Sequence, residues 1–137
     1  MRLALIGLAL ALSAGCASMG GRLLNASDDL EERSGQLYEE VRHDSYGGGR
    51  SVEAAEELAR AAADFRRAVE RDSPREDLDA GFDRIARSYH ALREYFDHGS
   101  ADRIERDRFQ NVTNAYLDVE GALRFRLSEF SSDRKVR

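Results

Sequence analysis

The stretch SPREDLDAGFDRIARSYHALREYF, residues 73–96, decides the fold of this chain. Its apolar residues recur at alternating steps of four and three, and they are Leu78, Phe82, Ile85, Tyr89, Leu92 and Phe96. This spacing places them along one face of an α-helix, where they must pack against an apolar partner. Ser73, Pro74 and Glu76 match the N-cap, N1 and N3 positions of a capping box. The sequence therefore predicts a helix that Ser73 caps and that buries one apolar face in a core.

Three other segments carry the same apolar spacing. The first contains Leu23, Leu30, Leu37 and Val41, the second Ala55, Leu58, Ala62, Phe65 and Val69, and the last Phe109, Val112, Tyr116, Val119, Leu123, Leu127 and Phe130. Glycines at 47–49 and at Gly99 separate segments, and Ser51 and Ser100 stand where the next N-caps are expected. Short loops between long helices favour antiparallel neighbours. The predicted fold class is all-α, an antiparallel up-down-up-down four-helix bundle.

The last two segments share the pattern F-x2-[IV]-x3-Y. It occurs once at Phe82, Ile85 and Tyr89, and again at Phe109, Val112 and Tyr116. An internal repeat would explain the match. Heptad-spaced cores also produce such matches readily, and we favour this second explanation.

The composition is that of one folded domain with a charged surface. The chain has 137 residues, of which 34% are charged and 42% hydrophobic, and its formal net charge is −5. Acidic and basic residues are interleaved, which argues against a nucleic-acid-binding patch. Acid-before-base pairs four residues apart are expected to form ion pairs, namely Asp29–Arg33, Glu56–Arg60, Asp83–Arg87, Asp102–Arg106 and Glu120–Arg124. The single cysteine excludes an internal disulfide.

The N-terminus has the layout of a secretory signal. Arg2 is followed by an uncharged apolar run, residues 3–12, which is shorter than the ~20 residues that a spanning helix needs. The run ends in Leu12-Ser13-Ala14-Gly15-Cys16, which resembles the lipobox of bacterial lipoproteins, although that family prefers leucine where Ser13 stands. This resemblance, over residues 1–17, implies that residues 1–15 are removed and that Cys16 carries an S-diacylglycerol group and an N-acyl chain. Cleavage at a nearby small residue, which would leave Cys16 an inert thiol, is the alternative.

The same resemblance implies a location. In enteric members of the family, a residue other than aspartate after the cysteine, here Ala17, directs the protein to the outer membrane, facing the periplasm. We expect a lipidated cysteine with a flexible tether at 16–21, a helical bundle domain at 22–131 and a basic C-terminal tail at 132–137. Because an even number of antiparallel helices returns the chain to its starting end, the basic tail is expected near the membrane.

Few residues are suited to catalysis or metal binding. The chain has three histidines, and it has no nucleophile elbow, glycine-rich phosphate loop or zinc-binding helix motif. His43, Asp44, His98 and Asp102 are expected together at the membrane-distal end, where they could hold a metal ion. Their charges also complement the dipoles of the helix ends, which we take as the explanation, so we predict no metal site. Tyr46 and Tyr95 lie near loops and are candidates for binding a partner.

These observations favour a non-catalytic protein-interaction module of the cell envelope, bound to membrane lipid through Cys16 and to an envelope protein. The alternative is a metal or small-ligand binding bundle that uses the histidines and aspartates of the distal end. A cell-wall tether is a third hypothesis, because the murein lipoprotein of enteric bacteria is also short and helical. Its C-terminal lysine is not matched here, since Lys135 is followed by Val136 and Arg137. We predict no enzyme activity and no cofactor besides the lipid.

Overall fold

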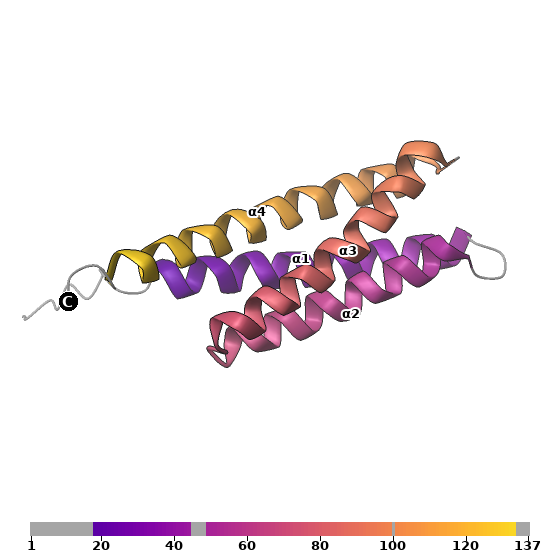
Figure 1. The fold of residues 1–137 in the computed structure, drawn as a ribbon. Helices are drawn as coiled ribbons and strands as arrows, with labels where there is room; N and C mark the ends of the chain where they lie inside the picture. The colour runs from indigo at the N-terminus through magenta and orange to yellow at the C-terminus, as the bar shows by residue number, and fades with distance from the viewer. Residues whose placement is uncertain (1–17, 45–48, 100, 134–137) are drawn as a thin grey trace, which may run out of the picture.

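The computed structural model describes residues 18–44, 49–99 and 101–133. These residues form four helices, which are α1 (Ser18–Asp44), α2 (Arg50–Glu70), α3 (Arg75–His98) and α4 (Arg103–Asp133). Successive helices run in opposite directions (Figure 1), with α1 packed against both α2 and α4, and α2 packed against α3. The predicted antiparallel up-down-up-down four-helix bundle is confirmed, and the described residues contain no strand.

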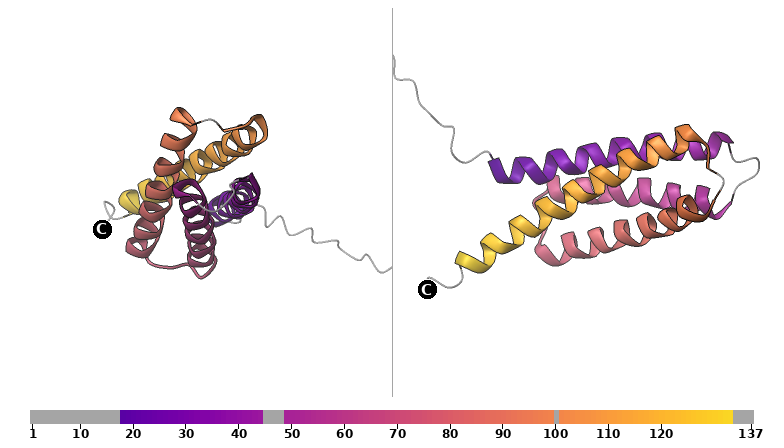
Figure 2. Two further views of the ribbon diagram at one scale, coloured as in Figure 1. Left: turned by 90° about the vertical axis from the view of Figure 1, so that its right-hand side faces the viewer. Right: turned by 90° about the horizontal axis from the view of Figure 1, so that it is seen from above.

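The two ends of the bundle differ in which chain segments they hold. The start of α1, the turn between α2 and α3 and the end of α4 lie together at one end, which we call the near pole (Figures 1 and 2). The end of α1, the start of α2, the end of α3 and the start of α4 lie at the opposite end, the far pole. The near pole is therefore the end closest in sequence to Cys16, which itself lies outside the described residues.

The core follows the apolar spacing of the sequence. Every stripe residue expected in the first two helices is buried, as are Leu78, Ile85, Tyr89, Leu92 and Phe96 of α3. Phe82 and Phe109 are only partly buried but pack against the core. The side chains of Leu127 and Phe130 lie outside the described part of the chain. Burial of this size is the main favourable term in holding four amphipathic helices together.

The core face of α1 also holds two serines that the apolar spacing did not indicate. Ser27 and Ser34 alternate with the leucines and are 1% and 0% exposed. Ser27 Oγ donates to the carbonyl oxygen of Leu24 at 2.8 Å, and Ser34 Oγ donates to that of Leu30 at 2.6 Å. Both hydroxyls are thus satisfied within their own helix, at no cost of unpaired polar groups. Their small size lets α1 lie close to α2 and α4, where buried alanines such as Ala61 and Ala115 face the same core.

Helices α3 and α4 meet differently, through large aromatic rings and with little close approach of their backbones. The rings of Tyr89 and Tyr116 stack with centroids 4.2 Å apart and planes 10° apart. Phe82 stacks on Tyr116 at 5.4 Å, and Tyr89 stacks on Phe109 at 5.6 Å. The shared F-x2-[IV]-x3-Y patterns therefore pair crosswise, the Phe of each helix with the Tyr of the other, because the helices are antiparallel.

The turn between α2 and α3 corrects the predicted capping box. Asp72 has a left-handed backbone, with φ 52, at the position after the C-cap Arg71. The N–H groups of Asp72 and Ser73 donate to the carbonyl oxygens of Val69 and Ala68, both over 3.0–3.1 Å, which is the Schellman pattern. Ser73 is thus used in ending α2, and the N-cap of α3 is Pro74, without a side-chain cap bond. The prediction that Ser73 caps α3 was wrong.

Other helix ends also differ from the prediction in detail. Gly49 is the N-cap of α2, and Ser51 lies buried in the first turn instead of capping it. Gly99 ends α3 as predicted, and a Cβ at this position would collide with the carbonyl oxygen of Tyr95. Ser100 lies outside the described residues, and α4 begins after Asp102. At the other pole α1 begins at Ser18, so residues 18–21 of the expected tether are helical.

Three of the five expected ion pairs within helices form, at Asp29–Arg33, Glu56–Arg60 and Glu120–Arg124. Asp83–Arg87 and Asp102–Arg106 are not paired in the structure. Arginines instead link segments that are distant in the sequence. Arg66 of α2 contacts Asp28 and Glu31 of α1, and Arg126 of α4 contacts Asp72. Because these pairs lie at the surface, solvent screens the attraction and each contributes little to stability.

Candidate functional site

The four candidate metal ligands are not gathered into one cluster in the part of the chain that the structure describes. His43 and Asp44 at the end of α1, and His98 and Asp102 beside the α3–α4 connection, are all exposed at the far pole. Asp102 Oδ1 accepts a hydrogen bond of 2.8 Å from the Glu105 N–H, so this carboxylate serves the start of α4. Among the residues that the structure describes, no group of three or more His, Cys, Asp or Glu side chains is placed to hold a metal ion.

Glu105 is the far-pole residue that the sequence did not indicate. It is 4% exposed, and one of its carboxylate oxygens, Oε2, accepts a hydrogen bond of 3.2 Å from the Asp102 N–H. Together with the bond from Glu105 N–H to Asp102, this makes a reciprocal capping box. Burial raises the pKa of the Glu105 carboxyl above its usual 4.5, and the nearby carboxylates of Asp102, Asp44 and Glu40 raise it further. The signal in the sequence was D-x-x-E at 102–105.

The two tyrosines proposed for partner binding have different outcomes. Tyr46 lies outside the described residues. Tyr95 is half-buried, and its ring packs edge-on against Phe96 with centroids 5.1 Å apart and planes at 81°. Part of the Tyr95 ring therefore packs at the end of the aromatic cluster, and only the remainder is accessible to a partner.

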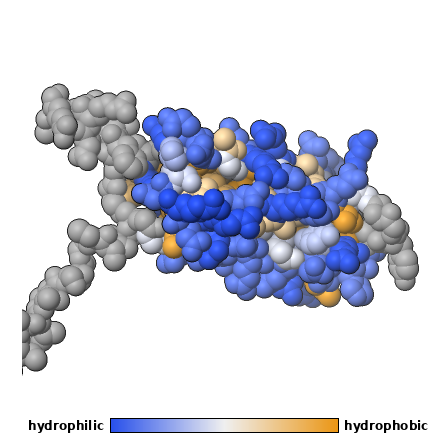
Figure 3. Space-filling view, turned by 90° about the horizontal axis from the view of Figure 1, so that it is seen from below, coloured by the Kyte–Doolittle hydropathy of each residue, from blue (hydrophilic) through white to orange (hydrophobic). Residues whose placement is uncertain are grey.

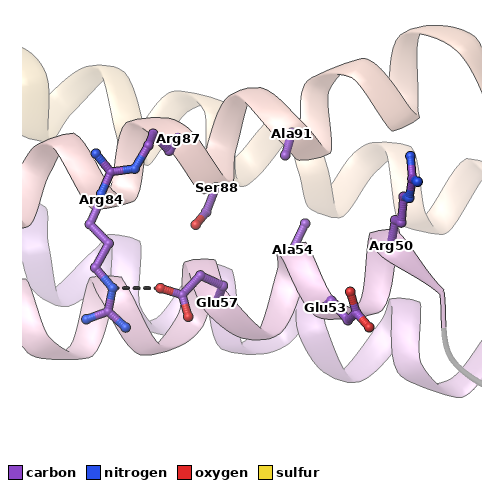
Figure 4. Close-up of a pocket in the computed structure, with 8 residues that line it drawn as sticks. All are labelled: Arg50, Glu53, Ala54, Glu57, Arg84, Arg87, Ser88 and Ala91. Carbon is purple, nitrogen blue, oxygen red and sulfur yellow. Dashed lines mark hydrogen bonds and ion pairs between the residues drawn. The ribbon is translucent and has the colours of Figure 1, made fainter.

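A shallow open groove of about 460 Å³ lies between α2 and α3. The face of the molecule seen in Figure 3 is largely hydrophilic with scattered apolar spots. Ala54 of α2 and Ala91 of α3 point toward each other across it, and Ser88 points into it from α3 (Figure 4). These side chains are small, so the floor is set back between the two helices. The sequence pattern gave only one hint of it, the row of Ala54, Ala61 and Ala68 beside the core stripe of α2.

The charged residues that line this groove are three arginines and two glutamates, namely Arg50, Arg84, Arg87, Glu53 and Glu57. Arg84 bridges Glu57 at 2.6 Å and Asp64 at 2.9 Å on α2, and these carboxylates raise the pKa of its guanidinium. Arg50 and Arg87 are exposed and form no ion pair with the described residues. Arg50 also stands at the start of α2, where the helix dipole adds positive potential. The rim can therefore offer two free guanidinium groups to carboxylates of a bound segment.

Two further observations bear on the chain as a whole. Within the described ranges, none of the helices combines the length and the apolar character needed to cross a bilayer. Comparison with protein-family models, with curated proteins and with solved structures found no match to this chain.

Proposed function

We propose that this chain is a lipid-anchored, non-catalytic protein-interaction module of the bacterial cell envelope, attached through Cys16 to the outer membrane and facing the periplasm. The lipobox-like residues 12–16 support the anchor. The position of α1 supports its geometry, since the helix begins at Ser18, two residues after Cys16. An anchored bundle would have its near pole at the membrane and its sides open to a partner.

The observation that carries the interaction role is the groove between α2 and α3. Sites for small molecules usually enclose most of the ligand surface, whereas this groove is shallow and open. An extended or helical protein segment can lie along such a floor, with short apolar side chains over Ala54 and Ala91. Carboxylates on that segment would pair with Arg50 and Arg87. The proposed partner is therefore an acidic segment of another envelope protein.

The anchor is tested with three forms of the full chain in a Gram-negative bacterium, namely wild type, Cys16→Ser and Ala17→Asp. Each is labelled with a clickable palmitate analogue and followed by membrane fractionation. We expect label and outer-membrane recovery for wild type, neither for Cys16→Ser, and label with inner-membrane retention for Ala17→Asp. Equal behaviour of wild type and Cys16→Ser would contradict the anchor.

The groove is tested by in-cell crosslinking of the wild type, Arg87→Glu and Arg93→Glu. Arg93 lies on the same helix, is 58% exposed and pairs with Asp97, so its variant is a matched change of charge outside the groove. We expect one crosslinked envelope protein with wild type and Arg93→Glu, and its loss with Arg87→Glu. Metal content of the purified chain is measured alongside, and stoichiometric metal without any crosslinked partner would favour the alternative of ligand binding at the far pole.

A further inference from the structure

The outer face of α4 differs from the rest of the molecular surface. Three large hydrophobic side chains are exposed among the described residues, and all three lie on α4. They are Ile104 at 54%, Leu117 at 56% and Phe125 at 48% exposure. No other helix covers the outer side of α4 (Figures 1 and 2). The face seen in Figure 3 is by comparison largely hydrophilic, with scattered apolar spots. The apolar exposure is therefore concentrated on one helix.

Leu117 and Phe125 belong to a single stripe with Gly121 between them. Residues four apart lie on the same face of a helix, so the three follow one another over about 12 Å. Gln110 and Asn114 continue the stripe toward the far pole without charge. Ile104 is on the same helix but falls on a different side of it, because thirteen residues separate it from Leu117.

Gly121 is unfavourable for an isolated helix. It is exposed in mid-helix, and a Cβ added there would meet nothing within 4 Å. A glycine at such a position costs about 1 kcal/mol relative to alanine. A glycine between two exposed apolar residues allows the backbone of another helix to approach closely, which offsets this cost when the face is covered.

The charges beside the stripe indicate what covers it. Asp107 and Asp118 lie along one flank, and Arg106 and Arg124 lie along the other together with Glu120. The two aspartates and the two arginines are exposed, and of these only Arg124 forms an ion pair in the described part of the chain, with Glu120. When two copies of such a helix pair in parallel about a two-fold axis, the left flank of one faces the right flank of the other. The acidic flank of each copy then faces the basic flank of its partner.

An antiparallel pairing of the same faces is less favourable. Its two-fold axis brings like flanks together, so the acidic flank of one copy would face the acidic flank of the other. We infer that α4 is the interface of a parallel, two-fold symmetric dimer of this chain, with Leu117, Gly121 and Phe125 each meeting their own counterpart. The parallel orientation also leaves both near poles on the same side, which agrees with two anchors in one membrane although the inference does not depend on the lipid.

The pairing is tested with single cysteines in the purified full chain carrying Cys16→Ser, so that each introduced cysteine is the only thiol. The variants are Leu117→Cys, Gly121→Cys, Phe125→Cys and, as a control off the stripe, Ile104→Cys. Under mild oxidation in detergent we expect disulfide-linked dimers from the three stripe positions and only monomer from Ile104→Cys. Crosslinking at Gly121 alone would mean an antiparallel pair, and uniform or absent crosslinking would mean no specific pair. Either outcome overturns the proposal.

A second measurement guards against misfolded cysteine variants. Leu117→Arg and its control Ile104→Arg both place a charge on an exposed position of α4, so neither should disturb the monomer fold. We expect Leu117→Arg to weaken self-association about tenfold or more in sedimentation experiments, since it removes a central apolar contact, and Ile104→Arg to leave it unchanged. Equal association of the two variants would overturn the proposal. Because no lipid is present, this result is independent of whether Cys16 is an anchor.

Discussion

The packing of α1 against α2 and α4 contrasts with the packing of α3 against α4. In the first contact, leucines alternate with the buried serines Ser27 and Ser34, and the backbones lie close together. In the second, stacked rings such as those of Tyr89 and Tyr116 fill the space, and the backbones stay further apart. All these helices have the same heptad-like spacing. The period thus decides which face is buried, and side-chain size decides how far apart two buried faces lie.

The contrast is most directly tested by deleting an aliphatic side chain from the close contact. Leu30 is 0% exposed, and Leu30→Ala should destabilise the fold by about 2–5 kcal/mol through lost burial and the cavity left behind. Leu24→Ala, at a partly buried position of the same helix, is the control and should cost less. Urea unfolding monitored by circular dichroism measures both. Equal costs would mean that α1 does not pack as tightly as its burial indicates.

Enlarging a small residue tests the same contact from the other side. Ser34 occupies a position where the spacing alone would favour leucine. Ser34→Leu should nevertheless cost about 1–3 kcal/mol, because the close helices leave no room for the larger side chain. Ser34→Ala should stay within about 0.5 kcal/mol, since the hydroxyl donates only to its own helix. Chemical unfolding measures the free energy of unfolding of both variants. A Ser34→Leu variant more stable than wild type would show that the helices can move apart to admit the larger side chain.

The aromatic contact should respond more weakly to a conservative change. The Tyr89 hydroxyl donates to Thr113 Oγ1 at 3.2 Å, and Thr113 in turn donates to the carbonyl oxygen of Phe109 at 3.0 Å. Tyr89→Phe keeps the stacked ring and should cost about 0.5–1.5 kcal/mol. A double-mutant cycle with Thr113→Val measures the coupling between the two hydroxyls. A coupling energy of zero would mean that the ring stacking alone holds α3 to α4.

The free energy of unfolding should depend on pH through Glu105, which lies at the far pole, where both contacts end. Its raised pKa means that the folded state keeps a proton which the unfolded state has released. Stability from this group is present below its usual pKa of 4.5 and is lost as the pH rises through the higher folded value. Glu105→Gln keeps an acceptor oxygen and removes the charge, so it should be more stable than wild type at pH 7 and should lose this pH dependence. Unfolding at pH 4 and 7 measures it, and identical pH profiles for the two proteins would contradict the role of Glu105.

The smallest effect is expected at the near pole, in the turn between α2 and α3. Asp72→Gly removes the strain of a left-handed backbone, which should add a few tenths to about 1 kcal/mol, less what is lost with the exposed contact to Arg126. Asp72→Ala keeps the strain and loses that contact, so it should be the less stable of the two. Thermal unfolding ranks them, and the reverse order would show that the Arg126 contact outweighs the strain.

Much of this fold is determined by the sequence itself. The four apolar stripes predict the helices, their buried faces and the antiparallel order, because burying an amphipathic face requires a partner and short loops allow only a neighbour. The resemblance of residues 12–16 to a lipobox likewise implies an anchor at Cys16, and this remains a prediction. Such features depend on residues close together in the chain, so a linear pattern contains them.

Other features were decided by the tertiary structure. Ser73 was expected to cap α3, but its N–H donates to the Ala68 carbonyl oxygen at the end of α2. The turn there depends on the left-handed backbone of Asp72, a position at which the sequence has no glycine to indicate it. Ser34 and Glu105 are polar residues whose burial depends on how closely other helices approach them. The groove over Ala54 and Ala91 and the uncovered stripe around Gly121 depend on the spacing between helices. That spacing results from the sizes of side chains on different segments, and no single segment's periodicity determines it.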